Sequence, residues 1–101
     1  MDISETLNQR GKIHGPWSAD SGLSQALKEA RKKWTLNPVM PAFMREALDL
    51  IDTKQARIEV GDPFDIDHWS DISGYATLVV RELERAQTWV DAAEQAPPSK
   101  H

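Results

Sequence analysis

The sequence predicts an all-α fold, a small bundle of about four helices. Apolar residues recur at three- and four-residue spacing in every long segment, the pattern of a helix that buries one face. The alternation typical of strands is missing from the sequence. A chain of 101 residues, 40% of them apolar, fits one domain with a modest core. We therefore predict a single helical domain over residues 1–95 and a flexible tail over 96–101.

The longest predicted helix runs from Asp67 to Gln95. Asp67 is expected to be its N-cap, and Asp71 in the first turn suits the positive end of the helix dipole. His68 and Tyr75 lie near the centre of the apolar side of this helix, and Asp71 lies at its edge. Three hydrogen-bonding side chains near the buried face of one helix end indicate a binding site.

A second long helix is predicted from Ala42 to Val60, after Pro41 and before a C-cap at Gly61. The short acidic turn over residues 61–66 predicts that the two long helices form an antiparallel hairpin. Three polar side chains near the end of the first helix should then approach the start of the second. These are Lys54 and Arg57, at the flank of the apolar stripe, and Gln55, expected in its middle.

The N-terminal part is expected to hold a short helix over Ile3–Arg10 and another over Ser18–Lys33, with a loop between them. Two glycines and a proline within residues 11–16 predict an irregular backbone in that loop. It carries Arg10, His14 and Trp17, so it is either a solvated connector or a loop that contacts an anion. A further loop is expected over residues 34–41.

The composition of the chain argues against several classes of function and of binding site. A net charge of -4 argues against bulk nucleic-acid binding, because neutralising phosphates needs a basic surface. The absence of cysteine rules out disulfides and thiolate metal sites. No apolar run reaches the roughly 20 residues of a membrane span, and no signal peptide is visible, so a cytoplasmic protein is expected. Four tryptophans in a short chain indicate that at least one covers a ligand or a second subunit.

A set of motifs in fixed order resembles a family of small phage and prophage proteins of unknown function, over roughly residues 5–85. The motifs are Arg10-Gly11, His14-Gly15-Pro16-Trp17, Ser24-Gln25-Ala26-Leu27, Arg45-Glu46-Ala47-Leu48-Asp49 with Lys54 and Arg57, Gly61-Asp62-Pro63, Asp67-His68-Trp69, Asp71-Ile72 and Gly74-Tyr75-Ala76. The chain departs from the family at His14, where an aromatic residue is expected, and at Pro16-Trp17, where Asp-Phe is expected. The last motif is also similar to phage nucleotide modification associated domains and to all-α MazG-like nucleotide pyrophosphohydrolases.

The resemblance implies a phage protein in an infected or lysogenic bacterial host, with a leaning toward nucleotides. We expect a non-catalytic nucleotide-binding protein without a cofactor, and one role open to such a protein is to sequester a host immune signal. Base stacking on Tyr75 and phosphate contacts at Lys54 and Arg57 would suit such a ligand. The expected ligand-binding residues are Lys54, Arg57, His68, Asp71, Tyr75, Gln55, Arg10, His14 and Trp17.

Two alternatives stay open. A MazG-like pyrophosphohydrolase would hold Mg²⁺ on Glu46, Asp49, Asp67 and Asp71, but Glu46 and Asp49 should point away from the apolar stripe of their helix, toward solvent. The other alternative is a structural protein-interaction module that uses its tryptophans. A zinc site at His14, His68 and a carboxylate is a minor further possibility.

We also expect a homo-oligomer, most simply a two-fold dimer. The predicted C-terminal helix would be roughly 43 Å long. The preceding helices are too short to cover its whole apolar stripe. A second copy of the chain would be the simplest cover.

Overall fold

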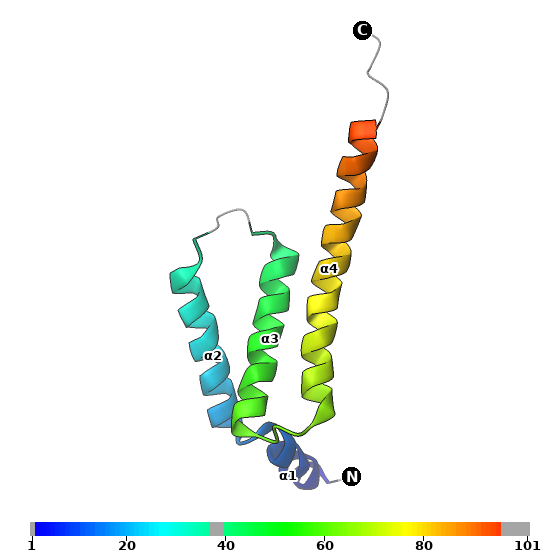
Figure 1. Ribbon diagram of the computed structural model, residues 1–101. Helices are drawn as coiled ribbons and strands as arrows, with labels where there is room; N and C mark the ends of the chain where they lie inside the picture. Colours follow the sequence, from blue (N-terminus) through cyan, green and yellow to red (C-terminus); the bar gives the residue numbers. More distant parts are fainter. Residues whose placement is uncertain (1, 37–39, 96–101) are drawn as a thin grey trace.

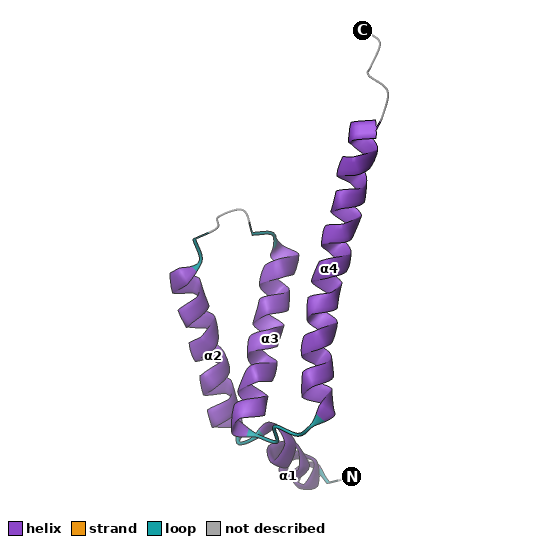
Figure 2. Ribbon diagram, viewed as in Figure 1, coloured by secondary structure: helices purple, strands orange, loops and turns teal. Residues whose placement is uncertain are grey.

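The computed structural model describes residues 2–36 and 40–95, and it confirms the all-α prediction. It contains α1 (Ile3–His14), α2 (Trp17–Trp34), α3 (Ala42–Val60) and α4 (Ile66–Gln95) (Figure 1). The described residues form helices and connecting loops, without a strand (Figure 2). The predicted tail and the middle of the predicted loop at 34–41 fall outside the described residues. No described helix is long and apolar enough to cross a membrane.

The helix α3 lies in the centre, between α2 and α4 (Figure 1). Among the described residues, the backbones of α2 and α4 make no contact with each other. The helices α3 and α4 form the predicted antiparallel hairpin, and α1 crosses beneath the lower ends of α2 and α3. The three longer helices therefore form one layer of a small bundle.

The helix α3 has the predicted bounds, and Gly61 ends it by donating its backbone N–H to the Arg57 carbonyl at 2.9 Å. The prediction for α1 was wrong, because this helix continues through Gly11 to His14. A helical glycine costs only about 1 kcal/mol, which the surrounding turns can offset. The reversal occurs instead at Gly15, whose φ of 83° lies in the left-handed region.

The predicted N-cap of α4 was displaced by two residues. The helix begins at Ile66, and the Asp65 carboxylate accepts a hydrogen bond from the Asp67 backbone N–H at 2.9 Å. This is the geometry of an N-cap at Asp65. The Asp62 carboxylate accepts from the Phe64 backbone N–H in the same way, so two aspartates shape the acidic turn.

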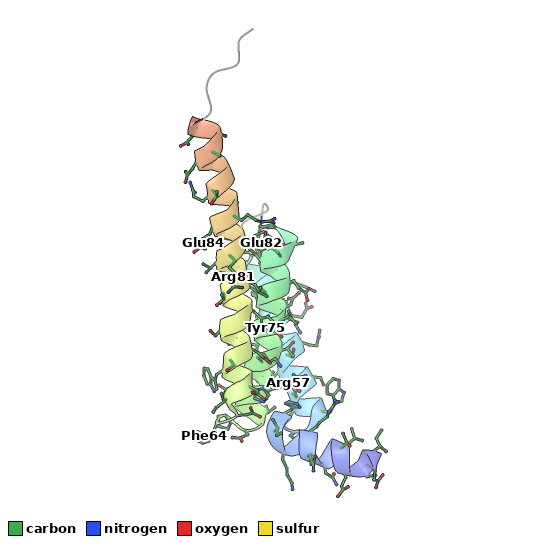
Figure 3. All side chains as sticks on the ribbon, turned by 90° about the vertical axis from the view of Figure 1, so that its right-hand side faces the viewer. Arg57, Phe64, Tyr75, Arg81, Glu82 and Glu84 are labelled. Atoms are coloured by element: carbon green, nitrogen blue, oxygen red, sulfur yellow. The ribbon has the colours of Figure 1, made fainter. Side chains whose placement is uncertain are left out.

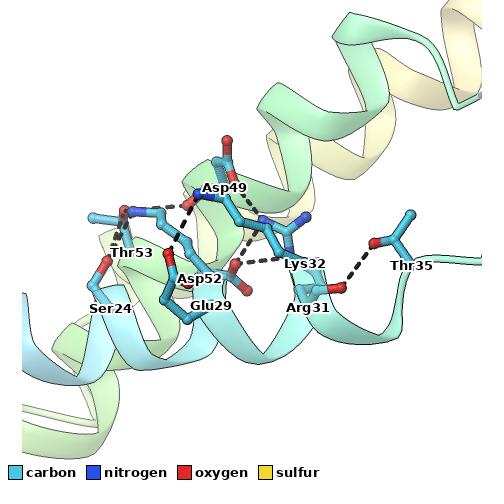
Figure 4. Close-up of polar contacts among 9 residues, drawn as sticks. Ser24, Glu29, Arg31, Lys32, Thr35, Asp49, Asp52 and Thr53 are labelled. Carbon is cyan, nitrogen blue, oxygen red and sulfur yellow. Dashed lines mark hydrogen bonds and ion pairs between the residues drawn. The ribbon is translucent and has the colours of Figure 1, made fainter. Parts of the chain in front are cut away.

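Polar side chains hold α2 against α3 (Figure 4). Arg31 donates to Asp52 at 2.8 and 2.9 Å and also pairs with Asp49. About one turn earlier in α2, Lys28 donates to both Ser24 and Thr53 at 2.9 Å. Partial burial lowers the pKa of Arg31, but its hydrogen bonds to the two aspartates raise that pKa overall. The α2–α3 contact is therefore built largely on hydrogen bonds.

The buried residues are unusual for a domain of this size. Among the described residues, the only buried apolar side chains are Ala47 and Ala56, whereas four buried residues are polar: Asp20, Ser24, Asp52 and His68. The predicted mid-stripe residue Gln55 is exposed. That prediction was wrong because α2 and α4 flank α3 and leave one of its faces uncovered.

Two glycines let the end of α1 meet the end of α3. A Cβ atom at Gly15 would lie 2.2 Å from the Val60 carbonyl oxygen, and one at Gly61 would lie 2.3 Å from the Ile13 carbonyl oxygen. The Asp62 backbone N–H donates to that same Ile13 oxygen at 2.8 Å. Any side chain at either glycine would push this backbone contact apart.

Gly15→Ala should therefore destabilise the fold by about 2 kcal/mol or more, because it combines a left-handed backbone with a backbone clash. The matched control is Gly22→Ala, since a Cβ atom at Gly22 meets nothing within 4 Å. That helical substitution should stabilise by up to about 1 kcal/mol. Urea unfolding of both variants measures the difference, and equal stabilities would refute the close contact.

Candidate functional site

A hollow of the described surface lies where α1 turns into α2, beside the end of α3. Its volume is ≈ 560 Å³. Its polar and aromatic lining comes from Arg10, His14, Trp17, Asp20 and Arg57. Four of these five, all but Asp20, are residues that the sequence nominated for ligand binding. The site thus gathers two guanidinium groups, an imidazole, an indole and a carboxylate.

Local backbone structure explains this gathering. The last turns of α1 carry Arg10 and His14, and the first turn of α2 carries Trp17 and Asp20. The reversal at Gly15 joins the two helices after a single further residue, Pro16, so the four side chains stay near the same corner. The last turn of α3 adds Arg57.

Asp20 and Arg57 form the buried part of this site. Asp20 is only 3% exposed, and one of its carboxylate oxygens, Oδ2, lies 3.5 Å from Nε of Arg57. This separation makes an ion pair but not a hydrogen bond. Its other oxygen, Oδ1, and the Arg57 Nε are buried and have no hydrogen-bond partner among the described residues. Leaving a buried polar group unpaired costs about 1–3 kcal/mol, so a bound molecule could recover free energy here.

His14 and His68 connect the site to α4. Nδ1 of His14 lies 3.4 Å from Nε2 of His68, and the rings are tilted by 48° with their centres 5.1 Å apart. Nε2 of His68 also lies 3.3 Å from the Ile13 carbonyl oxygen. A carbonyl only accepts, so a hydrogen bond at this contact would place the proton of His68 on Nε2. In that tautomer Nδ1 of His14 would accept, and Nε2–H of His14 would be free to donate.

The electrostatic surroundings keep His14 neutral near pH 7. Burial lowers the pKa of its imidazole below the usual 6.5, and the nearby positive charge of Arg57 and the His68 ring lower it further. Asp20 acts in the opposite direction with a smaller effect. A negatively charged group entering the hollow would oppose these influences and favour the protonated ring.

The other nominated residues lie elsewhere. Lys54, whose side chain is 14% exposed, pairs with Asp71 at 2.8 Å across the α3–α4 seam. The hydrogen bond from Lys54 holds the pKa of Asp71 below its usual value. Tyr75 lies farther along the bundle than Arg57 (Figure 3). Lys54 is therefore a structural partner of Asp71, and His68 contacts His14 and the Ile13 carbonyl oxygen instead of Tyr75.

The four nominated metal carboxylates are spread over different contacts. Glu46 and Asp67 are exposed, and Asp71 pairs with Lys54. Asp49 was expected to face solvent, but it is only partly exposed and pairs with Arg31 of α2. Among the described residues, no three His, Asp or Glu side chains group closely enough to hold a metal ion.

Sequence reasoning missed Asp20 and Asp52. Asp20 lies three residues before Leu23 and seven before Leu27, so it shares their side of α2, a position that predicts burial. Asp52 faces α2 rather than the apolar stripe of α3, and only the packing of the two helices reveals its partner Arg31.

Searches of protein-family models, curated proteins and solved structures find no match to this chain.

The fold should lose stability as the pH falls below about 6.5. Unfolding restores the usual pKa of His14, so the unfolded chain binds the proton first and gains relative to the folded state. His14→Asn, which keeps an acceptor near Nδ1 but does not titrate, should reduce this loss. Urea unfolding between pH 7.5 and 5 tests it, and an unchanged slope in the variant would contradict this environment for His14.

Proposed function

We propose that the protein binds a small nucleotide in the hollow between α1, α2 and α3 and does not alter it chemically. One observation carries this proposal: a single cavity of ≈ 560 Å³ combines Arg10 and Arg57 with the Trp17 indole and the buried Asp20 carboxylate. Each of these groups has a counterpart in a nucleotide.

The side chains that line the hollow suit the chemical groups of a nucleotide. Guanidinium groups bind phosphate oxygens with strong, charge-assisted hydrogen bonds. The indole of Trp17 is 77% exposed and offers a face on which a base can stack. The Asp20 carboxylate accepts hydrogen bonds only, so it would select a sugar hydroxyl or a base amino group. His14 can donate from Nε2 to a phosphate without first becoming charged.

The contacts of the acidic residues favour binding over metal-dependent hydrolysis. A magnesium site of the MazG type would need Asp49 and Asp71 free to bind the ion, and both pair with basic side chains, Arg31 and Lys54. The hollow itself offers one carboxylate, Asp20, beside two arginines. We therefore propose a binder that needs no metal or other cofactor.

The resemblance to small phage proteins suggests the biological setting. In the cytoplasm of an infected or lysogenic bacterial host, a small protein that holds a nucleotide tightly can remove a host immune signal from circulation. Such sequestration needs affinity and abundance but no turnover. We also propose that the chain acts as a homodimer, because thirteen large apolar side chains, including Trp17, Trp34 and Trp69, are exposed on the described surface.

The first test is a thermal-shift screen of the protein against nucleoside mono-, di- and triphosphates and cyclic dinucleotides. Any compound that raises the melting temperature is then incubated with the protein and recovered by chromatography, with Mg²⁺ and with EDTA. We expect intact compound and equal affinity in both conditions. Recovery of a hydrolysed product only with Mg²⁺ would support the pyrophosphohydrolase instead.

The second test separates the hollow from general surface stickiness. Trp17→Ala should weaken binding of the strongest compound from the screen by about 1–3 kcal/mol, because it removes the stacking face. The matched control is Trp34→Ala, since Trp34 is 80% exposed at the opposite end of α2 and does not line the hollow. Isothermal titration calorimetry measures both. Equal losses in the two variants would argue for a protein-interaction role of the tryptophans.

A third test concerns the phosphate contact. Arg10→Ala should weaken binding at least tenfold while leaving stability nearly unchanged, because Arg10 is an exposed residue of α1. Lys12→Ala removes an equally exposed positive charge from the same helix, away from the lining of the hollow. If both variants bind equally well, the phosphate does not occupy the proposed position.

A further inference from the structure

We infer that a second copy of this chain packs on one face of the helix layer, against an apolar groove between α3 and α4. The groove is lined by Met40, Met44, Ala47, Leu48, Ile51, Ala76 and Val79. It shares no residue with the ligand hollow, so this surface is independent of the proposed binding function.

The first argument is architectural. A helical domain buries its apolar stripes between two layers of helices. Here α2 and α4 flank α3 without touching each other, so the described helices supply one layer and leave its faces without a cover. As a result, no apolar side chain larger than alanine is buried in the described part of the chain.

The second argument is the size of the uncovered surface. A stable interface needs about 800 Å² from each partner. Among the described residues, thirteen large apolar side chains are at least 38% exposed, and Leu83 of α4 is one of them.

The third argument selects the face. Both sides of the α3–α4 seam are grooved, and Ala47 and Val79 line both grooves. The second groove, beside Phe43 and Leu78, is also lined by Glu46 and Glu82. The first groove has only apolar residues in its lining, and the centre of an interface is depleted in charged residues. The face of Met44 and Leu48 is therefore the one a partner covers.

The occupant is a second copy because α4 provides the surface such a copy would need. It has 30 residues against 19 in α3, so its second half extends beyond the partner helix in the same chain (Figure 1). Leu83, at the start of that half, is 47% exposed. A two-fold pairing places the same apolar face on both chains and lets each overhanging half of α4 pack on the other chain.

Light scattering tests the assembly directly. The intact protein should have a mass of at least twice 11.4 kDa at micromolar concentration. Leu48→Glu should lower the mass to that of one chain, while Leu78→Glu, a matched change on the opposite face, should leave it unchanged. A monomeric intact protein would overturn the inference, and loss of assembly in Leu78→Glu alone would overturn the assigned face.

Spin labels provide a second measurement that does not require altering the groove. Because the chain has no cysteine, Gln55→Cys and Glu46→Cys each create one labelling position on an exposed residue of α3. By helical spacing, Gln55 shares the face of Met44 and Leu48, and Glu46 lies on the opposite side. Dipolar coupling should be strong between labels at 55 and disappear on dilution with unlabelled protein. Stronger coupling at 46 than at 55 would overturn the proposal.

Discussion

The lower end of the structure depends on the contacts that the carbonyl oxygen of Ile13 makes. This oxygen belongs to the last turn of α1, where carbonyls lack partners within their own helix. The Asp62 backbone N–H donates to it at 2.8 Å, and Nε2 of His68 lies 3.3 Å away. One atom thus joins α1, the α3–α4 turn and α4. The two glycines at positions 15 and 61 allow the backbones to come this close. The hollow between α1, α2 and α3 exists because this contact fixes α1 across the end of α3.

Arg31 and Arg57 show how a structural contact differs from a candidate binding site. Arg31 is held by two carboxylates, Asp49 and Asp52, with hydrogen bonds from its Nε and Nη2 nitrogens. Arg57 pairs with Asp20 at a distance too long for a hydrogen bond. The first arrangement holds α2 to α3. The second leaves a buried donor and a buried acceptor without a hydrogen-bond partner among the described residues, on two side chains that line the hollow.

The sequence predicted local structure well wherever a residue has one dominant effect. Pro41 and Gly61 set the bounds of α3, and the apolar stripes identified every long helix. The loop predicted at Gly11 was wrong because a single glycine weakens a helix without ending it. The site was harder. The motifs around residues 10–17 and Arg57 nominated four residues that line one hollow, whereas Lys54, Asp71 and Tyr75 lie outside its lining. Asp20 was not predicted as a residue of the site, because the helix dipole already explains an acidic residue in a first helical turn.

The way in which α1 is attached has a consequence for the kinetics of the protein. This helix has no buried residue, and Ile3 and Leu7 are 71% and 59% exposed. Ile13 and His14 in its last turn make hydrogen-bonding contacts with Asp62 and His68. Helices with so few buried contacts open locally at low free-energy cost, and their amide protons exchange quickly with solvent. Yet the same helix supplies Arg10 and His14 to the hollow. Any molecule held by those two side chains must also hold α1 closed, so amide protection along this one helix would report occupancy of the hollow without any label.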